Sequence, residues 1–66
     1  SDELRISANN SIGWLRVIAA DGREVLVRSV TATNASIAVD KLQAGTYLLI
    51  ATFTDGTEAR ERFIKH

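Results

Sequence analysis

Hydrophobic residues recur at every second position along most of the chain, which is the period of a β-strand with one buried face. The pattern predicts six strands, over Leu4–Ser7, Ile12–Ala20, Arg23–Val30, Ser36–Asp40, Thr46–Thr54 and Thr57–Lys65. The inward-facing residues expected on these strands include Leu15, Val17, Ala19, Ile37, Val39, Tyr47, Leu49, Ala51 and Phe53. The polar stretch Thr31–Ala35 predicts a loop, and no segment has the apolar spacing of a helix. The expected fold is therefore all-β.

Two Asp-Gly pairs, Asp21-Gly22 and Asp55-Gly56, lie between alternating segments. Each pair suits the two central positions of a type I′ hairpin turn, because Asp tolerates positive φ and Gly adopts it freely. Lys41–Gly45 predicts a tight connection in which Leu42 covers one end of the core and Gly45 adopts a conformation closed to other residues. Strands that follow one another about every 10 residues are typical of a small β-sandwich.

Some hydrophobic residues lie on the second, more polar faces of the strands: Trp14, Ile18, Leu48 and Ile50. Because these faces are partly apolar, we expect another sheet or a partner to cover them. For Trp14 we expect a place in the core, with an exposed platform for a sugar or a protein as the alternative. The charged strand Thr57–Lys65 is expected at a sheet edge, where charges discourage pairing with neighbouring strands.

Composition removes several classes of function. The 66 residues carry eight basic and eight acidic side chains, so there is no electrostatic case for binding nucleic acid. No apolar run approaches the length of about 20 residues that spans a bilayer, and no membrane insertion is expected. With no cysteine and one histidine, neither a disulfide, a structural zinc ion nor another cofactor is expected. The chain suffices for one small domain, and without methionine it is expected to be a segment of a longer protein.

Catalysis is not expected either. Nucleophilic catalysis needs a base beside the nucleophile, and the one histidine is His66, the last residue. Asp21 and Asp55 are expected to serve the turns, while Glu58 and Glu61 are expected to be solvated charges on an edge strand. The sequence therefore indicates that the protein is not an enzyme.

Three segments carry a resemblance to a known family. Val17–Val25 resembles a V-x-x-x-x-G-[RK]-x-V hairpin, with Gly22 and Arg23 at the motif positions. Ile37–Leu49 is similar to an I-x-[VL]-x-x-L-x-x-G-x-Y segment, with Leu42, Gly45 and Tyr47 at the motif positions. The chain ends on Phe63, Ile64 and Lys65 before His66, which resembles a short apolar-basic finish. In this order the three segments resemble the type A C-terminal sorting domains of the type IX secretion system.

The resemblance implies a single C-terminal sorting domain over residues 1–66, folded as a small immunoglobulin-like antiparallel β-sandwich of six to seven strands. It implies a secretion signal that directs an upstream cargo domain across the outer membrane of Gram-negative bacteria of the Bacteroidetes group. A sortase-like protease usually then removes the signal. Such a protein is in the periplasm in transit, and afterwards on the outer-membrane surface or outside the cell. Family members usually carry a Pro-Asn-Pro-type motif and a first strand upstream; either that segment is missing from this sequence or this member lacks it.

The expected partners are the type IX translocon and sortase components, reached through exposed strand edges and the C-terminal segment. Phe63, Ile64 and Lys65 are expected to be the signal, against the alternative of a merely structural last strand. The other motif residues, Gly22, Arg23, Leu42, Gly45 and Tyr47, are expected to be structural. Exposed edges leave a strand-exchanged homodimer open. The competing function is that of an immunoglobulin- or fibronectin-like adhesion module.

Overall fold

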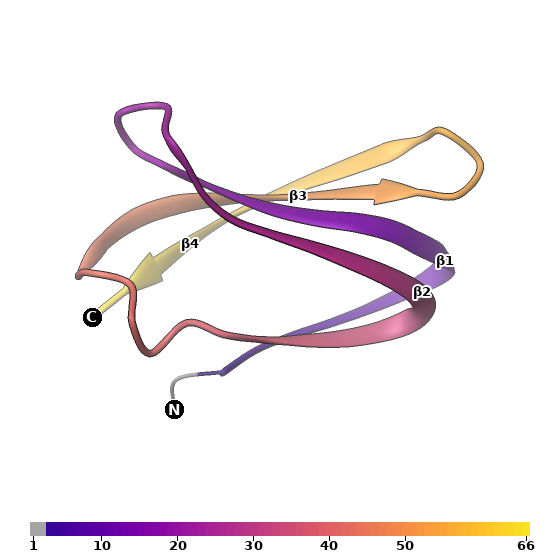
Figure 1. The fold of residues 1–66 in the computed structure, drawn as a ribbon, viewed down its shortest axis with the longest axis horizontal. Helices are drawn as coiled ribbons and strands as arrows, with labels where there is room; N and C mark the ends of the chain where they lie inside the picture. Colours follow the sequence, from indigo (N-terminus) through magenta and orange to yellow (C-terminus); the bar gives the residue numbers. More distant parts are fainter. Residues whose placement is uncertain (1–2) are drawn as a thin grey trace.

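The computed structural model describes residues 3–66, which form one antiparallel sheet of four strands. The strands are β1 (Glu3–Ala19), β2 (Glu24–Ala38), β3 (Gly45–Phe53) and β4 (Glu58–Lys65). Their order in the sheet is β2-β1-β3-β4, so that two hairpins, β1–β2 and β3–β4, join where β1 pairs with β3 (Figure 1). Residues 3–66 contain no helix that could cross a membrane. The all-β prediction is confirmed.

The β1–β2 hairpin bends over the rest of the sheet. The register of β1 against β2 shifts between Ser7 and Ile12 and again between Ile12 and Trp14, and such irregularities bend and twist a sheet. Before the bend β1 pairs with β2 alone; from Ile12 onward it pairs with both β2 and β3. At the bend, a Cβ atom on Gly13 would lie 3.3 Å from the backbone oxygen of Thr52. This close approach explains why a glycine stands at this position. Figure 1 shows the early part of β1 and the late part of β2 below the layer formed by the other strands.

The prediction of six to seven strands is wrong for residues 3–66. The segments Leu4–Ser7 and Ile12–Ala20 are two parts of β1, and Arg23–Val30 and Ser36–Asp40 fall largely within β2. The predicted loop Thr31–Ala35 is strand as well, paired with β1. Main-chain hydrogen bonds hold a strand together whether or not its side chains are apolar, so a polar stretch with a partner strand continues the ladder. The last two predicted strands are confirmed as β3 and β4.

The hairpin turns contain three residues, so the two-residue type I′ prediction is also wrong. The Gly22 N–H donates to the Ala19 oxygen (2.9 Å), and the Ala19 N–H donates to the Arg23 oxygen (2.8 Å). Gly22 has φ 89°, while no residue other than glycine among residues 3–66 has positive φ, Asp21 included. This arrangement is a type I turn followed by a glycine bulge, which needs only one residue with positive φ. The second turn repeats it through Phe53, Gly56 and Thr57, with 3.0 and 2.8 Å bonds and φ 92° at Gly56.

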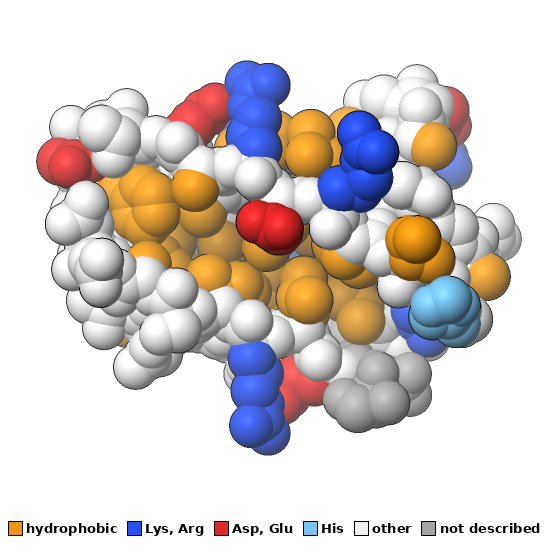
Figure 2. Space-filling view, turned by 180° about the vertical axis from the view of Figure 1, so that it is seen from behind, with side chains coloured by type: hydrophobic (Ala, Val, Ile, Leu, Met, Phe, Trp, Pro, Cys, Tyr) orange, Lys and Arg blue, Asp and Glu red, His pale blue; other side chains and the backbone are white. Residues whose placement is uncertain are grey.

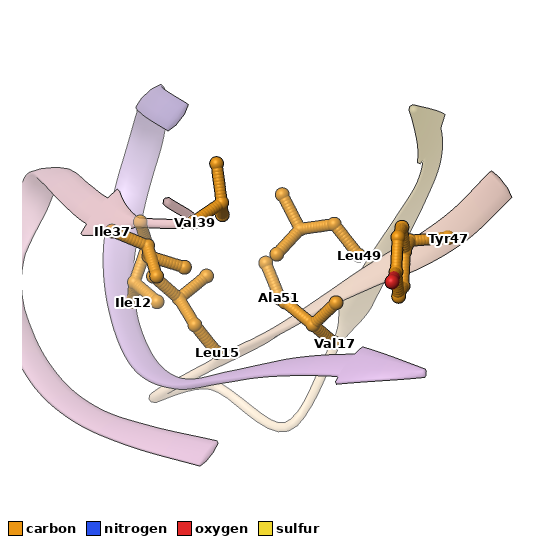
Figure 3. Packing of buried hydrophobic residues seen from close by; sticks show 8 residues of the cluster. All are labelled: Ile12, Leu15, Val17, Ile37, Val39, Tyr47, Leu49 and Ala51. Carbon is orange, nitrogen blue, oxygen red and sulfur yellow. The ribbon is translucent and has the colours of Figure 1, made fainter. Parts of the chain in front are cut away.

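The core lies between the two parts of the bent sheet. Its buried side chains come from β1, β2, β3 and the residue after β2, and are Ile12, Leu15, Val17, Ile37, Val39, Tyr47, Leu49 and Ala51 (Figure 3). Leu4 and Ile6, from the early part of β1, are half-buried against this cluster, as are Ala19 and Phe53. The predicted inward face is therefore confirmed, and Ile12, which is fully buried, is added to it.

Candidate recognition site

The end of β4 lies directly against the start of β3. In the antiparallel register Gly45 is opposite Lys65, Thr46 is opposite Ile64, and Tyr47 is opposite Phe63. The second motif segment and the C-terminal finish lie at the start and at the end of the β3–β4 hairpin, and they therefore form one continuous piece of sheet. We call this piece, residues 45–47 with residues 63–65, the C-terminal clamp.

Tyr47 joins the two strands of the clamp to each other, to the connection before β3 and to the core. Its ring stacks on that of Phe63, with centroids 5.5 Å apart and planes at 21°. Its hydroxyl donates a 2.6 Å hydrogen bond to the backbone oxygen of Gln43, in the connection before β3. The ring is buried at 7% exposure and belongs to the core. Gln43 was not among the predicted site residues; the sequence signal that points to it is a tyrosine four residues later, whose buried hydroxyl needs a partner.

Of the remaining motif residues, Gly45 begins β3, and Leu42, Gly22 and Arg23 lie in the connections between strands. Gly45 has φ 154°, a value at which a side chain is strained, and so allows β3 to start there. Leu42 is half-buried against the core, and its N–H donates to the Val39 oxygen (3.1 Å). Arg23 follows Gly22 in the β1–β2 turn, and its Nε lies 3.1 Å from Asp21 Oδ2.

The β1–β2 turn and the clamp share one end of the molecule. Ala19, the last residue of β1, is opposite Tyr47 in the sheet. A surface hollow of about 350 Å³ is lined by Gly22 from the turn and by Thr46 and Tyr47 from the clamp, among others. The structure thus brings Gly22, Gly45, Tyr47 and the C-terminal segment to one end.

The C-terminal side chains alternate between the two faces of the sheet. Phe63 is half-buried on the core side, whereas Ile64 projects from the other face and is 61% exposed. Lys65 is half-buried again. A second hollow, of about 310 Å³, lies beside all three residues and reaches Leu4 of β1. The clamp therefore offers one anchored aromatic ring and one exposed aliphatic side chain.

The outer face of the sheet carries the tryptophan. Trp14 is 50% exposed, so the expectation that it lies in the core is wrong. The alternating pattern places it on the outer face, and within residues 3–66 no second sheet covers that face. Beside it Ile50 is only 7% exposed, although it is not part of the core cluster. Arg16 and Arg60 are the cross-strand neighbours of Ile50 in the register, and arginine packs its aliphatic stem along apolar neighbours.

Asp21 and Asp55 belong to the two hairpin turns, and Glu58, Arg60 and Arg16 form a charged group on the outer face. Hydrogen bonds from the Arg23 backbone N–H and from Thr57 hold the pKa of Asp21 and of Asp55, respectively, below the usual value. Glu58 lies 3.1 Å from Arg60 and 3.8 Å from Arg16, on the solvated side of β4. Across residues 3–66, no three acidic, histidine or cysteine side chains come together as a metal site would require.

Comparison with known proteins assigns the family. The family described as "secretion system C-terminal sorting domain" matches residues 1–66, the whole chain. Neither the curated proteins nor the solved structures contain a match. The family match confirms the resemblance drawn from the Gly22-Arg23, Leu42…Gly45…Tyr47 and C-terminal segments. The chain therefore belongs to the secretion system C-terminal sorting domain family, the C-terminal signals that direct proteins into type IX secretion.

Proposed function

We propose that the C-terminal clamp is the part of this sorting signal that the type IX machinery recognises. The observation that carries the proposal is that neighbouring residues of the clamp do different things: one is anchored in the fold and the next is exposed. Phe63 is anchored on Tyr47, while its neighbour Ile64 is held on the outer face at 61% exposure. A large aliphatic side chain held in a fixed position on a surface is suited to enter a pocket of a partner.

The proposal covers the course of secretion as well as the contact. The cargo carries the folded domain into the periplasm, components of the translocon bind the clamp, and the sortase components remove the domain after outer-membrane passage. The open edge of β4 supports binding by strand addition, since an edge strand offers unpaired main-chain groups. The domain acts by binding alone, without catalysis.

The test uses a matched pair of exposed hydrophobic residues. The chain is placed at the C-terminus of a fluorescent cargo with a signal for entry into the periplasm, in a bacterium that has type IX secretion. Ile64→Ser should retain the cargo in the periplasm, while Val27→Ser, which removes a 39% exposed side chain from β2, should leave export unchanged. Both substitutions are at the surface and should change stability by no more than about 0.5 kcal/mol.

Two further results bear on the proposal. Removal of residues 63–66 should block export completely. Export of the truncated cargo at the level of the intact one would contradict the assignment of the signal to the clamp, and so would equal export of the Ile64→Ser and Val27→Ser proteins.

We further propose two structural properties of the domain. The first is that the bent sheet is this protein's form of the immunoglobulin-like sandwich, which the enclosed core supports. The second is a strand-exchanged homodimer, which the open edges of β2 and β4 support. Sedimentation of the chain over a range of concentrations tests the dimer, and an experimental structure with the upstream cargo tests the sandwich.

The exposed Trp14 supports adhesion as a second candidate function. A half-exposed tryptophan on a sheet face that also carries Arg16, two residues along the same strand, has the composition of a binding surface. If this candidate is right, Trp14→Ala should abolish binding to a glycan or protein array without changing export. A variant that binds the array as well as the original chain would rule it out.

A further inference from the structure

An open groove separates the early part of β1 from β4. Residues 4–7 of β1 pair with β2 along one edge, and no strand within residues 3–66 pairs with their other edge. β4 pairs with β3 alone, so that the outer edge of residues 58–64 is open as well. No Cα atom of β1 lies within 8 Å of a Cα atom of β4. Paired strands are about 4.8 Å apart, so β1 and β4 are farther apart than two directly paired strands.

The floor of the groove is hydrophobic. A hollow of about 310 Å³ is bounded by Leu4 and Ile6 from β1 and by Leu49, Ala51 and Phe53 from β3. Figure 2 looks onto this side of the molecule, where hydrophobic side chains fill the hollow and charged side chains lie along its rims. The two walls thus offer main-chain donors and acceptors, and the floor offers apolar contact.

One acidic side chain points into this groove without a partner. Glu61 is opposite the buried Leu49 in the β3–β4 register, which places it on the core side of β4, and it lines the hollow. In the described part of the chain it makes neither a hydrogen bond nor an ion pair, whereas Glu58 on the other face of β4 pairs with Arg60 and Arg16. Two arginines also line the hollow, but Arg5 is paired with Glu3 and Arg60 with Glu58. The carboxylate of Glu61 is therefore the charge without a partner beside the apolar floor, and it favours an occupant that brings a cation.

We propose that this groove binds one extended strand of a partner protein. Its main chain bonds to the open edges of β1 and β4, alternate apolar side chains lie on the floor, and a lysine or arginine among them faces Glu61. The inference deepens the proposed function and rests on it for the statement that the partner belongs to the secretion machinery. A second copy of this chain fits less well, because the core-facing side of its own β4 would bring another Glu61, and like charges oppose pairing.

The test uses short labelled peptides and the 66-residue chain. The probe is Thr-Val-Thr-Lys-Thr-Val-Thr, and the control peptide has Glu in place of Lys; binding is followed by fluorescence anisotropy. The lysine peptide should bind at least about tenfold more tightly than the glutamate peptide, and Glu61→Lys should reverse this preference. Glu24→Lys, a matched charge reversal on β2 away from the groove, should leave the preference unchanged. A purely structural role of Glu61 would weaken both peptides alike and would not reverse their order.

Amide hydrogen exchange identifies the contact. Bound lysine peptide should protect amides within residues 4–7 and 58–64, and an N-methylated version of the peptide should lose both binding and protection. The proposal is overturned if neither peptide binds, or if the two peptides bind with equal affinity. It is also overturned if these amides become protected as protein concentration rises without peptide, or are already protected when the upstream cargo is attached. Export of the truncated cargo would refute the clamp as the signal but would leave the peptide measurements unaffected, so the two failures are distinguishable.

Discussion

The stack between Tyr47 and Phe63 holds β4 to the motif segment, and its strength can be measured by a double-mutant cycle. The substitutions are Tyr47→Leu, Phe63→Leu and both together. Centroids 5.5 Å apart with planes at 21° give an offset stack, which contributes about 0.5–1.5 kcal/mol beyond the burial of the rings. Tyr47→Leu also removes the 2.6 Å hydrogen bond to Gln43, worth about 1 kcal/mol. That bond is absent in both proteins with Leu at position 47, so it cancels in the cycle.

The assay is urea unfolding followed by far-ultraviolet circular dichroism on the four proteins. A chain of this size has a total stability of about 3–10 kcal/mol, so all four should be measured in sucrose, which strengthens burial and keeps the double variant folded. We expect a coupling free energy of about 1 kcal/mol, equivalent to about 4–8 °C in Tm for a domain of this size. A coupling below about 0.3 kcal/mol, the range of independent sites, would refute the idea that the rings anchor the last strand.

Three other predictions test the core, the turns and the charges. Leu15→Ala, at a side chain 1% exposed, should lower the free energy of unfolding by about 2–5 kcal/mol in the same assay, whereas Ser29→Ala at an exposed position should have little effect. Gly22→Ala should lower the free energy of unfolding in urea by about 1–2 kcal/mol, because φ is 89° there. The loss comes from the backbone alone, since a Cβ atom at this position would have no neighbour within 4 Å. An unchanged midpoint would argue against the glycine bulge. Because the folded pKa of Asp55 is lowered below 3.8, its contribution to stability is present above that pH and is lost as the pH falls through the lowered value; urea midpoints from pH 6 to pH 2 should show a smaller loss for Asp55→Asn.

The sequence predicts the strands better than their connections. Alternation around Leu15 and Leu49 is a local property, and it correctly identifies the buried face of β1 and β3. The polar residues 31–35 are strand for a nonlocal reason, since β1 supplies hydrogen-bond partners that no local pattern reveals. The turn length fails for a similar reason: a type I turn with a bulge satisfies the main chain with one glycine, and the Asp side chain accepts the N–H two residues later.

The candidate site is predictable in composition but not in arrangement. The motifs name Gly45, Tyr47 and Phe63, yet only the register of β3 against β4 shows that these residues face each other. Trp14 shows the limit in the other direction. Its position on a second face can be read from the alternation, whereas whether a second layer covers that face depends on where the chain folds, which the pattern does not contain.

The sheet order has a mechanical consequence. β4 is hydrogen-bonded to β3 alone, and its C-terminal end, at Lys65, is paired with the first residue of β3. A pull applied at the C-terminus would therefore load the β3–β4 bonds one after another, as in opening a zip, and would leave the β1–β2 hairpin and its seam with β3 in place. A pull applied at the upstream end loads β1 instead. Its first residues, 3–7, bond to β2 alone, but from Ile12 onward β1 bonds to β2 and β3 at once and must separate from both. The domain would thus resist tension from its cargo while its last strand remains the easiest part to detach.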